Sequence, residues 1–309
     1  MNLRIRVPAS TSNIGPGFDC FGMALTLYLD VEVRPAERLR ITAENADVPL
    51  DETNLIVRTF LDAIGRPATP PPLSLHLVNR IPLTRGLGSS AAARVAGLTL
   101  ASVFQRGAED FDRDGIAQRA VALEKHPDNA TPATYGGFCI CAGEAGFERV
   151  EMNDRRYLLI VPEMEIETPK ARASLPTQLS LADAVFNMQR AALGVARVTR
   201  RRELGALAPF ADRLHQRYRL AIDPRLRDAF DALAKSPAIE ALFLSGSGPT
   251  VFCLASDFGE ARAAGQTCFD GVGLGVRMLE VSVDNRGVQV ERIGFHRAGR
   301  QVPASPPTL

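Results

Sequence analysis

The sequence has 309 residues, of which 46% are hydrophobic, so the chain is long enough to bury one large core or two medium ones. Its net charge of +1 excludes an overall attraction to nucleic acid or to an anionic membrane. No apolar run reaches membrane-spanning length, the N-terminus lacks the apolar segment of a signal peptide, and the five cysteines have no zinc spacing. We therefore expect a soluble cytoplasmic protein with free thiols and without a nucleic-acid or membrane partner.

The first half of the chain combines predicted strands and helices around a loop rich in glycine and proline. Alternating or continuous apolar residues predict strands at 3–7, 25–33, 39–43, 73–78 and 138–142. The sequence predicts helices at 54–64, 91–104 and 115–123. Residues 8–19 contain two glycines, two prolines and several small polar residues, which predicts a tight loop without regular structure.

The second half is predicted to begin near 153–156, where polar residues interrupt the apolar pattern. Its helices are predicted at 180–203, 204–215, 225–235 and 258–272. Its strands are predicted at 158–162, 241–244, 250–254, 276–281 and 288–293. We therefore divide the chain into domains at 1–155 and 156–297, and expect the proline-containing tail at 298–309 to be disordered.

The segment at 82–92 reads Pro-Leu-Thr-Arg-Gly-Leu-Gly-Ser-Ser-Ala-Ala and joins a predicted strand to a predicted helix. Gly86 and Gly88 allow positive φ angles and a close approach of a ligand to the main chain. Ser89 and Ser90 are expected to cap the helix, whose free N–H groups and dipole favour an anion such as phosphate. An ordinary helix start and a Rossmann turn stay open from these residues alone, whereas the lack of any Gly-Lys-Ser/Thr excludes a Walker A loop.

Two further segments present polar side chains that suit ligand binding. Asn13 and Asp19 lie in the glycine- and proline-rich loop, where turn formation is the alternative to a functional role. The segment at 124–137 is dense in charged and polar residues, and Glu124 would suit a hard cation such as Mg²⁺. A solvated helix end is the alternative for Glu124, and His126 has no metal-ligand spacing to another histidine.

Four segments, in this order along the chain, resemble the signatures of the homoserine kinase family within the GHMP small-molecule kinases. They are Pro-Ala-Ser-Thr-Ser-Asn-Ile-Gly-Pro-Gly-Phe-Asp-Cys-Phe-Gly at 8–22, the loop at 82–92, Glu124–Gly137 and Ser245–Thr250. The resemblance implies an α+β fold of two domains, one like domain 2 of ribosomal protein S5 and a ferredoxin-like C-terminal domain. It also implies ATP- and Mg²⁺-dependent phosphorylation of the L-homoserine hydroxyl, a step toward threonine, by an enzyme that is usually a homodimer.

The resemblance implies a role for each matching position. Nucleotide contacts fall on Pro82, Arg85, Gly86, Leu87, Gly88, Ser89, Ser90, Ala91 and Ala92. Catalytic positions are Asn129, Glu124 and Ser90, the last two as Mg²⁺ ligands. Two shorter segments, Thr168–Arg172 and His215–Arg219, also resemble family segments. The implied substrate contacts are Asn13, Asp19, His126, Asp128, Thr168, Arg172, Arg219 and Ser247. Among these, Asp19 is expected to bind the substrate ammonium, and the two arginines its carboxylate.

The homoserine kinase branch lacks the aspartate base of other GHMP kinases, and Asn129 is an amide that cannot remove a proton. Transfer is therefore expected to depend on positioning and charge stabilisation, with the hydroxyl proton passing to a γ-phosphate oxygen. The sequence departs from the family pattern at Lys125, Thr131 and Arg217. A GHMP kinase for a mevalonate-like or sugar alcohol and a non-catalytic sensor are the alternatives. The N-terminal loop argues against the first, and the retained Glu124 and serines against the second.

Overall fold

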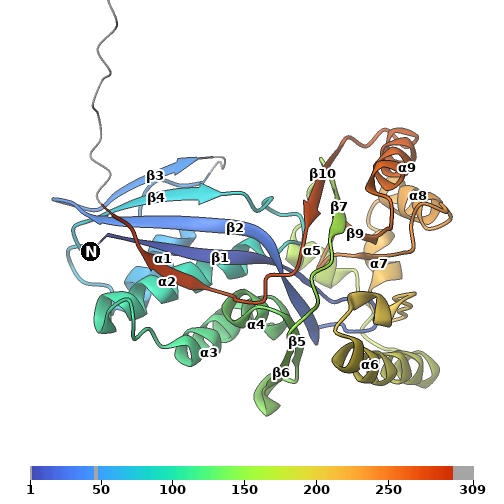
Figure 1. Ribbon diagram of the computed structural model, residues 1–309, viewed down its shortest axis with the longest axis horizontal. Coiled ribbons are helices and arrows are strands. Elements are labelled where there is room, and N and C mark those ends of the chain that lie inside the picture. Colours follow the sequence, from blue (N-terminus) through green and yellow to red (C-terminus); the bar gives the residue numbers. More distant parts are fainter. Residues whose placement is uncertain (1, 45–47, 295–309) are drawn as a thin grey trace, which may run out of the picture.

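The computed structural model describes residues 2–44 and 48–294, which fold around two sheets (Figure 1). The seven-stranded sheet has the order β11-β1-β2-β4-β3, and β5 and β6 extend it beside β2. Its strands are β1 (Leu3–Ser12), β2 (Phe21–Pro35), β3 (Arg40–Glu44), β4 (Leu73–Asn79), β5 (Phe138–Cys141), β6 (Phe147–Val150) and β11 (Gln289–Arg292). The tail predicted to be disordered, at 298–309, lies outside the described residues.

One face of the larger sheet packs against helices, and the opposite face is polar. The helices on the packed side are α1 (Leu55–Ala63), α2 (Ser89–Arg106), α3 (Arg113–Glu124) and α4 (Pro127–Tyr135) (Figure 1). The opposed residues Ile5 and Val31 on β1 and β2 are fully buried on this side. Their neighbours Arg4 and Glu32 form an ion pair on the other face. This alternation is typical of an antiparallel sheet with one packed face.

The four-stranded antiparallel sheet has the order β10-β7-β9-β8. Its strands are β7 (Tyr157–Pro162), β8 (Ala241–Leu244), β9 (Val251–Leu254) and β10 (Val276–Val281). On β7, Leu158 and Ile160 face a smaller core formed with helices α8 (Pro224–Leu233) and α9 (Phe258–Asp270). Leu159 faces the core of the larger sheet, which helix α6 (Leu181–Arg201) and the turn η2 (Leu204–Leu207) join. The short helices α5 (Thr168–Ala173) and α7 (Gln216–Leu220) carry Arg172 and Arg219.

Three differences from the predicted elements have local causes. The helix predicted at 204–215 is wrong, because this segment forms only η2 and irregular chain before α7. Helix α4 has no counterpart among the predicted elements, since Pro127, Pro132 and small residues produce no continuous apolar stripe. The loop predicted at 8–19 is shorter than expected, because β1 continues to Ser12 and β2 begins at Phe21.

The final strand also differs from the expectation. It was predicted to close the second half, but β11 pairs antiparallel with β1 in the larger sheet, where Leu3 lies opposite Arg292. The chain therefore returns to its N-terminal sheet after completing the smaller one. All five cysteines are free, as predicted. In the ranges 2–44 and 48–294, no helix is both long and apolar enough to cross a membrane.

Candidate active site

One cavity of about 170 Å³ collects the predicted site residues from both halves of the chain. Every predicted site residue lines it except Ala92, which is fully buried inside α2 and packs in the core. The cavity is also lined by four residues that the sequence did not identify, namely Ser12, Thr84, Ile166 and Gly246. Segments that are separate in the sequence therefore meet at a single concave site, where ligands commonly bind.

The phosphate loop, residues 82–92, leads directly into the N-terminus of α2. The expectation that a serine caps this helix is wrong, because the N-cap is Gly88, at φ 68°, and it has no side-chain cap. The hydroxyl of Ser90 instead donates a hydrogen bond to Oε1 of Glu124 at 2.8 Å. The first N–H groups of α2 therefore have no capping side chain, and these groups and the helix dipole favour an anion.

Glycine is required in the phosphate loop because neighbouring segments approach it very closely. A Cβ atom on Gly86, at φ 72°, would lie 2.2 Å from the carbonyl oxygen of Ser245. The Ser245 hydroxyl donates to the Gly86 carbonyl at 2.8 Å, so the turn at 245–249 supports the loop. A Cβ on Gly88 would lie 2.1 Å from Oγ of Ser10 on β1. These contacts leave no room for a side chain on the inner side of the loop.

A second cavity, of about 360 Å³, adjoins the phosphate loop. Its lining is mostly apolar and includes Leu29, Val48, Leu55, Leu77 and Ala93. Thr84, Ser89 and Ser90 line both cavities, so the two spaces meet at the start of α2. The sequence did not identify the apolar lining residues of this second cavity, because they come from separate segments that carry no common motif.

The side chain of Asn129 lies between the phosphate loop and β1. Its Oδ1 accepts a hydrogen bond from Oγ of Ser10 at 2.9 Å, and its Nδ2 donates to Oγ of Ser12 at 3.0 Å. Oδ1 also lies 3.1 Å from the Cβ position that Gly88 leaves free. The amide is therefore held in one orientation beside the loop, where it can donate or accept a hydrogen bond but cannot act as a base.

Glu124, at the end of α3, has two partners on the same oxygen. Its Oε1 accepts the hydrogen bond from Ser90 and also forms an ion pair with Nη1 of Arg94, a residue that the sequence did not identify. The hydroxyl and the carboxylate are hard oxygen donors of the kind that Mg²⁺ prefers. Among the described residues, no group of three or more His, Cys, Asp or Glu side chains could hold a metal ion alone. The residues therefore fit a Mg²⁺ ion that takes its other ligands from phosphate and water.

At the opposite end of the cavity, Arg172 binds Asp19. Nη2 of Arg172 lies 2.7 Å from Oδ1 and 3.0 Å from Oδ2 of Asp19, and 3.3 Å from Nδ1 of His126. Asn13 orients this loop, because its Oδ1 accepts the N–H of Asp19 at 2.9 Å. Asn13 and Asp19 both have positive φ angles, of 58° and 53°, which Asn and Asp tolerate better than most residues. Burial lowers the pKa of His126, so its imidazole is neutral at pH 7.

Asp128 and Arg219 are the most deeply buried charged side chains of the site, with exposures of 1% and 2%. Burial, followed by the charge of Asp19, raises the pKa of Asp128 to about 7. Burial lowers the pKa of Arg219 to about 10, so the guanidinium stays charged at neutral pH. Arg219 donates from Nη1 to the Gly246 carbonyl at 2.6 Å. Ser12 lies close enough to lower the pKa of Asp128 against burial and the charge of Asp19, yet neither carboxylate oxygen of Asp128 has a hydrogen bond of ordinary geometry among the described residues.

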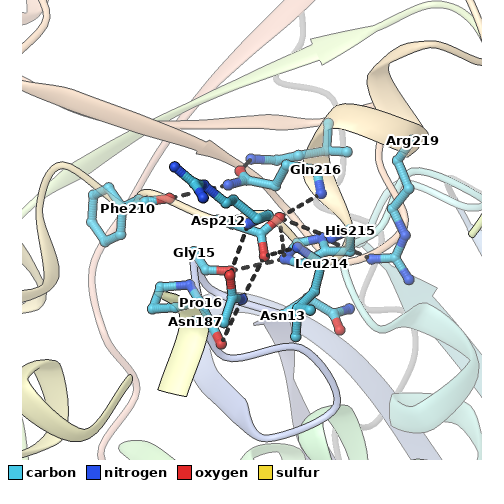
Figure 2. Close-up of polar contacts among 12 residues, drawn as sticks. Asn13, Gly15, Pro16, Asn187, Phe210, Asp212, Leu214, His215, Gln216 and Arg219 are labelled. Atoms are coloured by element: carbon cyan, nitrogen blue, oxygen red, sulfur yellow. Dashed lines mark hydrogen bonds and ion pairs between the residues drawn. The ribbon is translucent and has the colours of Figure 1, made fainter. Parts of the chain in front are cut away.

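A buried histidine connects the N-terminal loop to Arg219 (Figure 2). Nε2 of His215 lies 2.9 Å from the Gly15 carbonyl, and Nδ1 lies 3.4 Å from Nη1 of Arg219. Burial lowers the pKa of His215, so the neutral ring donates through Nε2 and accepts from Arg219 at Nδ1. Asp212 fixes the segment by accepting three backbone N–H groups at 214–216 and Nδ2 of Asn187.

The ring of Phe18 lies close to both arginines and to His215. Its ring centre is 5.3 Å from Cζ of Arg172 and 5.2 Å from Cζ of Arg219, and it stacks on His215 at 5.5 Å. Two guanidiniums repel each other, and an aromatic ring within cation–π distance of both offsets part of this repulsion. The sequence did not identify Phe18 or His215 as site residues, although both lie inside the segments that carried the resemblance.

Comparison with known proteins finds relatives that match most of the chain. The family described as GHMP kinases N terminal domain matches residues 54–137, and GHMP kinases C terminal matches residues 192–268. The homoserine kinase of Desulfitobacterium hafniense is 37% identical, covering 93% of this chain and 99% of the relative. That of Aquifex aeolicus is 36% identical with the same coverage.

A solved structure has the same fold. The crystal structure of homoserine kinase from Cytophaga hutchinsonii matches with a TM-score of 0.78 at 24% identity, covering 94% of this chain and 97% of that one. The two GHMP kinase domains that the sequence predicted are therefore confirmed. Given the identity and coverage of the two relatives above, this chain belongs to the homoserine kinase family of the GHMP kinases.

Proposed function

We propose that this chain transfers the γ-phosphoryl group of ATP to the side-chain hydroxyl of L-homoserine, forming O-phospho-L-homoserine and ADP on the route to threonine. The proposal depends on one observation, the unpartnered buried charged groups at one end of the cavity. Within the described chain, both carboxylate oxygens of Asp128 and the Nε atoms of Arg172 and Arg219 lack hydrogen-bond partners. Buried polar atoms without partners indicate a ligand, and cations beside carboxylates suit a zwitterionic amino acid.

The substrate charges pair with these side chains in a defined way. Arg172 and Arg219 approach from separate helices and bind the α-carboxylate together. Asp128 is the main partner of the ammonium, because both of its carboxylate oxygens are available. The carboxylate of Asp19 is already paired with Arg172. Asp19 then supplies a second carboxylate at 4.0 Å from His126, in the same pocket. Thr168 and Ser247 add hydroxyl groups to the lining.

The nucleotide occupies the other end. Its phosphates bind the free N–H groups at the start of α2, and the adjoining apolar cavity takes the base. The shared lining residues Thr84, Ser89 and Ser90 make the path between these two parts continuous. Arg85 lines the cavity from the loop, but its guanidinium donates to the carbonyls of Leu83 and Pro162 and pairs with Glu165.

Mg²⁺ would be held by Ser90 and Glu124 together with the phosphates. When bound, it supplies charge neutralisation between the β- and γ-phosphates. The protein's own contribution is to hold the hydroxyl and the carboxylate 2.8 Å apart at the N-terminus of α2. Asn13 and Asp19 lie at the other end of the cavity and take no part in holding the metal ion.

The transfer needs no dedicated base. The homoserine oxygen attacks the γ-phosphorus in line, the bond from phosphorus to the β,γ-bridging oxygen breaks, and ADP leaves with that electron pair. The hydroxyl proton passes to an oxygen of the transferred phosphoryl group. Asn129 orients the hydroxyl or a γ-phosphate oxygen through its fixed amide, and the loop N–H groups stabilise the developing charge.

We also propose that the protein works as a cytoplasmic homodimer. On α6, Leu181 and Met188 lie two turns apart and are 80% and 64% exposed. Apolar side chains this exposed on one helix face are typical of an interaction surface. Light scattering after size exclusion should give the mass of a dimer, and Met188→Glu should shift it toward the monomer if α6 forms the contact.

The function is tested by ADP release with ATP and Mg²⁺ against L-homoserine, L-threonine, L-serine, mevalonate, galactose and no acceptor. Turnover confined to L-homoserine is expected. Turnover of mevalonate or galactose would support the assignment of the phosphate site but would overturn L-homoserine as the substrate. ATP binding without turnover of any acceptor would identify a sensor and overturn the proposal.

A further inference from the structure

The guanidinium of Arg94 lies on the carboxylate that the proposed function gives to Mg²⁺. Arg94 follows Ser90 by one turn of α2, so both side chains reach Glu124 from the same helix face. Both contacts fall on Oε1 of Glu124, and the ion-paired side chains are only 23% and 16% exposed. Oε1 is therefore occupied by a hydroxyl donor and a cation.

Arg94 reaches Glu124 from a second space outside the site. It lines a groove of about 290 Å³ between α1, α2 and α3, together with Arg58 and Arg119, whereas Glu124 lines the active-site cavity. The guanidinium thus stands at the boundary between the groove and the site. The groove offers room into which the guanidinium could withdraw from Glu124.

A divalent cation and a guanidinium compete for one carboxylate oxygen. If a metal ion binds at Oε1, it either displaces Arg94 or remains close to a like charge, and both reduce its affinity. Conversely, Arg94 keeps the Glu124 charge compensated while no metal is bound, which avoids a half-buried unpaired carboxylate beside the phosphates.

We propose that Arg94 is a resident counter-ion that competes with the divalent cation for Glu124 and so raises the metal concentration that the enzyme requires. The proposal rests on the proposed function, because it takes Ser90 and Glu124 as the metal site. It assigns to Arg94 a role in setting metal affinity and none in contacting homoserine.

Binding of Mn²⁺ to the enzyme–ADP complex, followed by electron paramagnetic resonance of free Mn²⁺, tests this directly. Arg94→Met should tighten Mn²⁺ binding at least about tenfold, the scale of removing one nearby like charge. Arg58→Met is the matched control, since Arg58 lines the same groove outside the cavity, and it should leave Mn²⁺ affinity unchanged. Adding Glu124→Gln to Arg94→Met should abolish the gain.

Unchanged or weaker Mn²⁺ binding in a folded Arg94→Met protein would overturn the proposal, because Arg94 would then be neutral or would position Glu124 for the metal. Folding is checked by thermal unfolding of each variant. Failure of the proposed function is distinct from this result, since it would appear in the unmodified enzyme as absence of homoserine turnover. Mn²⁺ affinity is measured without any acceptor and does not depend on turnover.

Discussion

The two ends of the cavity bind charge by different means. At the phosphate end, one continuous loop presents helix N–H groups and hydroxyls, and the glycines that shape it have no room for side chains. At the amino-acid end, charged side chains from separate segments have buried polar atoms without hydrogen-bond partners among the described residues. Substitutions at the first end should therefore act through backbone geometry, and at the second through unpaired charge.

The largest effect is expected at the amino-acid end, from Arg219→Met. Removing one partner of a buried charge contact costs about 2–4 kcal/mol, so the KM for homoserine should rise roughly 30- to 1,000-fold with little change for ATP. Arg172→Met should have a smaller effect, because the Arg172 side chain is 38% exposed. Steady-state kinetics with both substrates measure this, and Arg219→Lys with thermal unfolding controls for folding. Equal changes in the KM values for homoserine and ATP would contradict the assignment of the two ends of the cavity to different substrates.

At the phosphate end, Gly86→Ala should act through strain and overlap. Gly65 provides the matched control, because it also has positive φ, 87°, but its Cβ position has no neighbour within 4 Å. Gly65→Ala should cost about 1 kcal/mol for the backbone angle alone. Gly86→Ala should cost about 1–3 kcal/mol more and weaken ATP binding, because the carbonyl of Ser245 must move. Chemical denaturation and ATP titration of both variants test this, and equal costs would show that the close approach is unimportant.

Asp128→Asn should stabilise the fold while it removes the ammonium partner. The pKa of Asp128 is raised from its usual 3.8 to about 7, so the native state binds this proton more tightly than the unfolded chain. The free energy of unfolding therefore falls as pH rises between these values, and the neutral amide avoids the loss. The gain in the free energy of unfolding from Asp128→Asn should be about 2–3 kcal/mol larger at pH 8 than at pH 5, as measured by denaturation. An equal gain at both pH values would refute an ionisation effect.

The smallest effect is expected where the chain departs from the family pattern. Lys125 ends α3 with φ at 65°, a conformation that favours glycine. Lys125→Gly should raise stability by about 0.5–1 kcal/mol without changing either KM. Arg202, which ends α6 at φ 56°, is the matched control, and Arg202→Gly should give a similar gain in the same denaturation experiment. A change in the KM for ATP at Lys125 alone would instead assign its charge to the nucleotide site.

The phosphate end was predictable because its geometry is local. A strand, two glycines and a helix follow one another within the segment at 73–106, so neighbours in sequence are also neighbours in space. The larger fold was predictable where apolar alternation was strong, as on β1 and β4. Even there, the pairing of β11 with β1 depends on contacts almost 290 residues apart, which a local pattern does not contain.

The interior of the site was less accessible to prediction. The ion pair of Arg94 with Glu124 joins residues on different helices, and the Phe18–His215 stack joins segments about 200 residues apart. Arginine is frequent in this sequence and usually exposed, so nothing distinguished Arg94 before its partner was known. Family resemblance identified the positions at the amino-acid end. Only the contacts in the structure showed that the Asp128 oxygens are available to a ligand and that Asp19 is already paired with Arg172.

The central claim is that the unpartnered charges recognise both charges of homoserine. The most direct measurement compares ADP release, at equal Mg²⁺ and ATP, with L-homoserine, 4-hydroxybutanoate, which lacks the ammonium, and 3-aminopropan-1-ol, which lacks the carboxylate. We predict turnover of L-homoserine, with kcat/KM lower for each analogue by at least about a hundredfold, because each leaves buried charges unpaired. Comparable kcat/KM for either analogue would contradict the account, since the corresponding buried charges would then play no part in recognition.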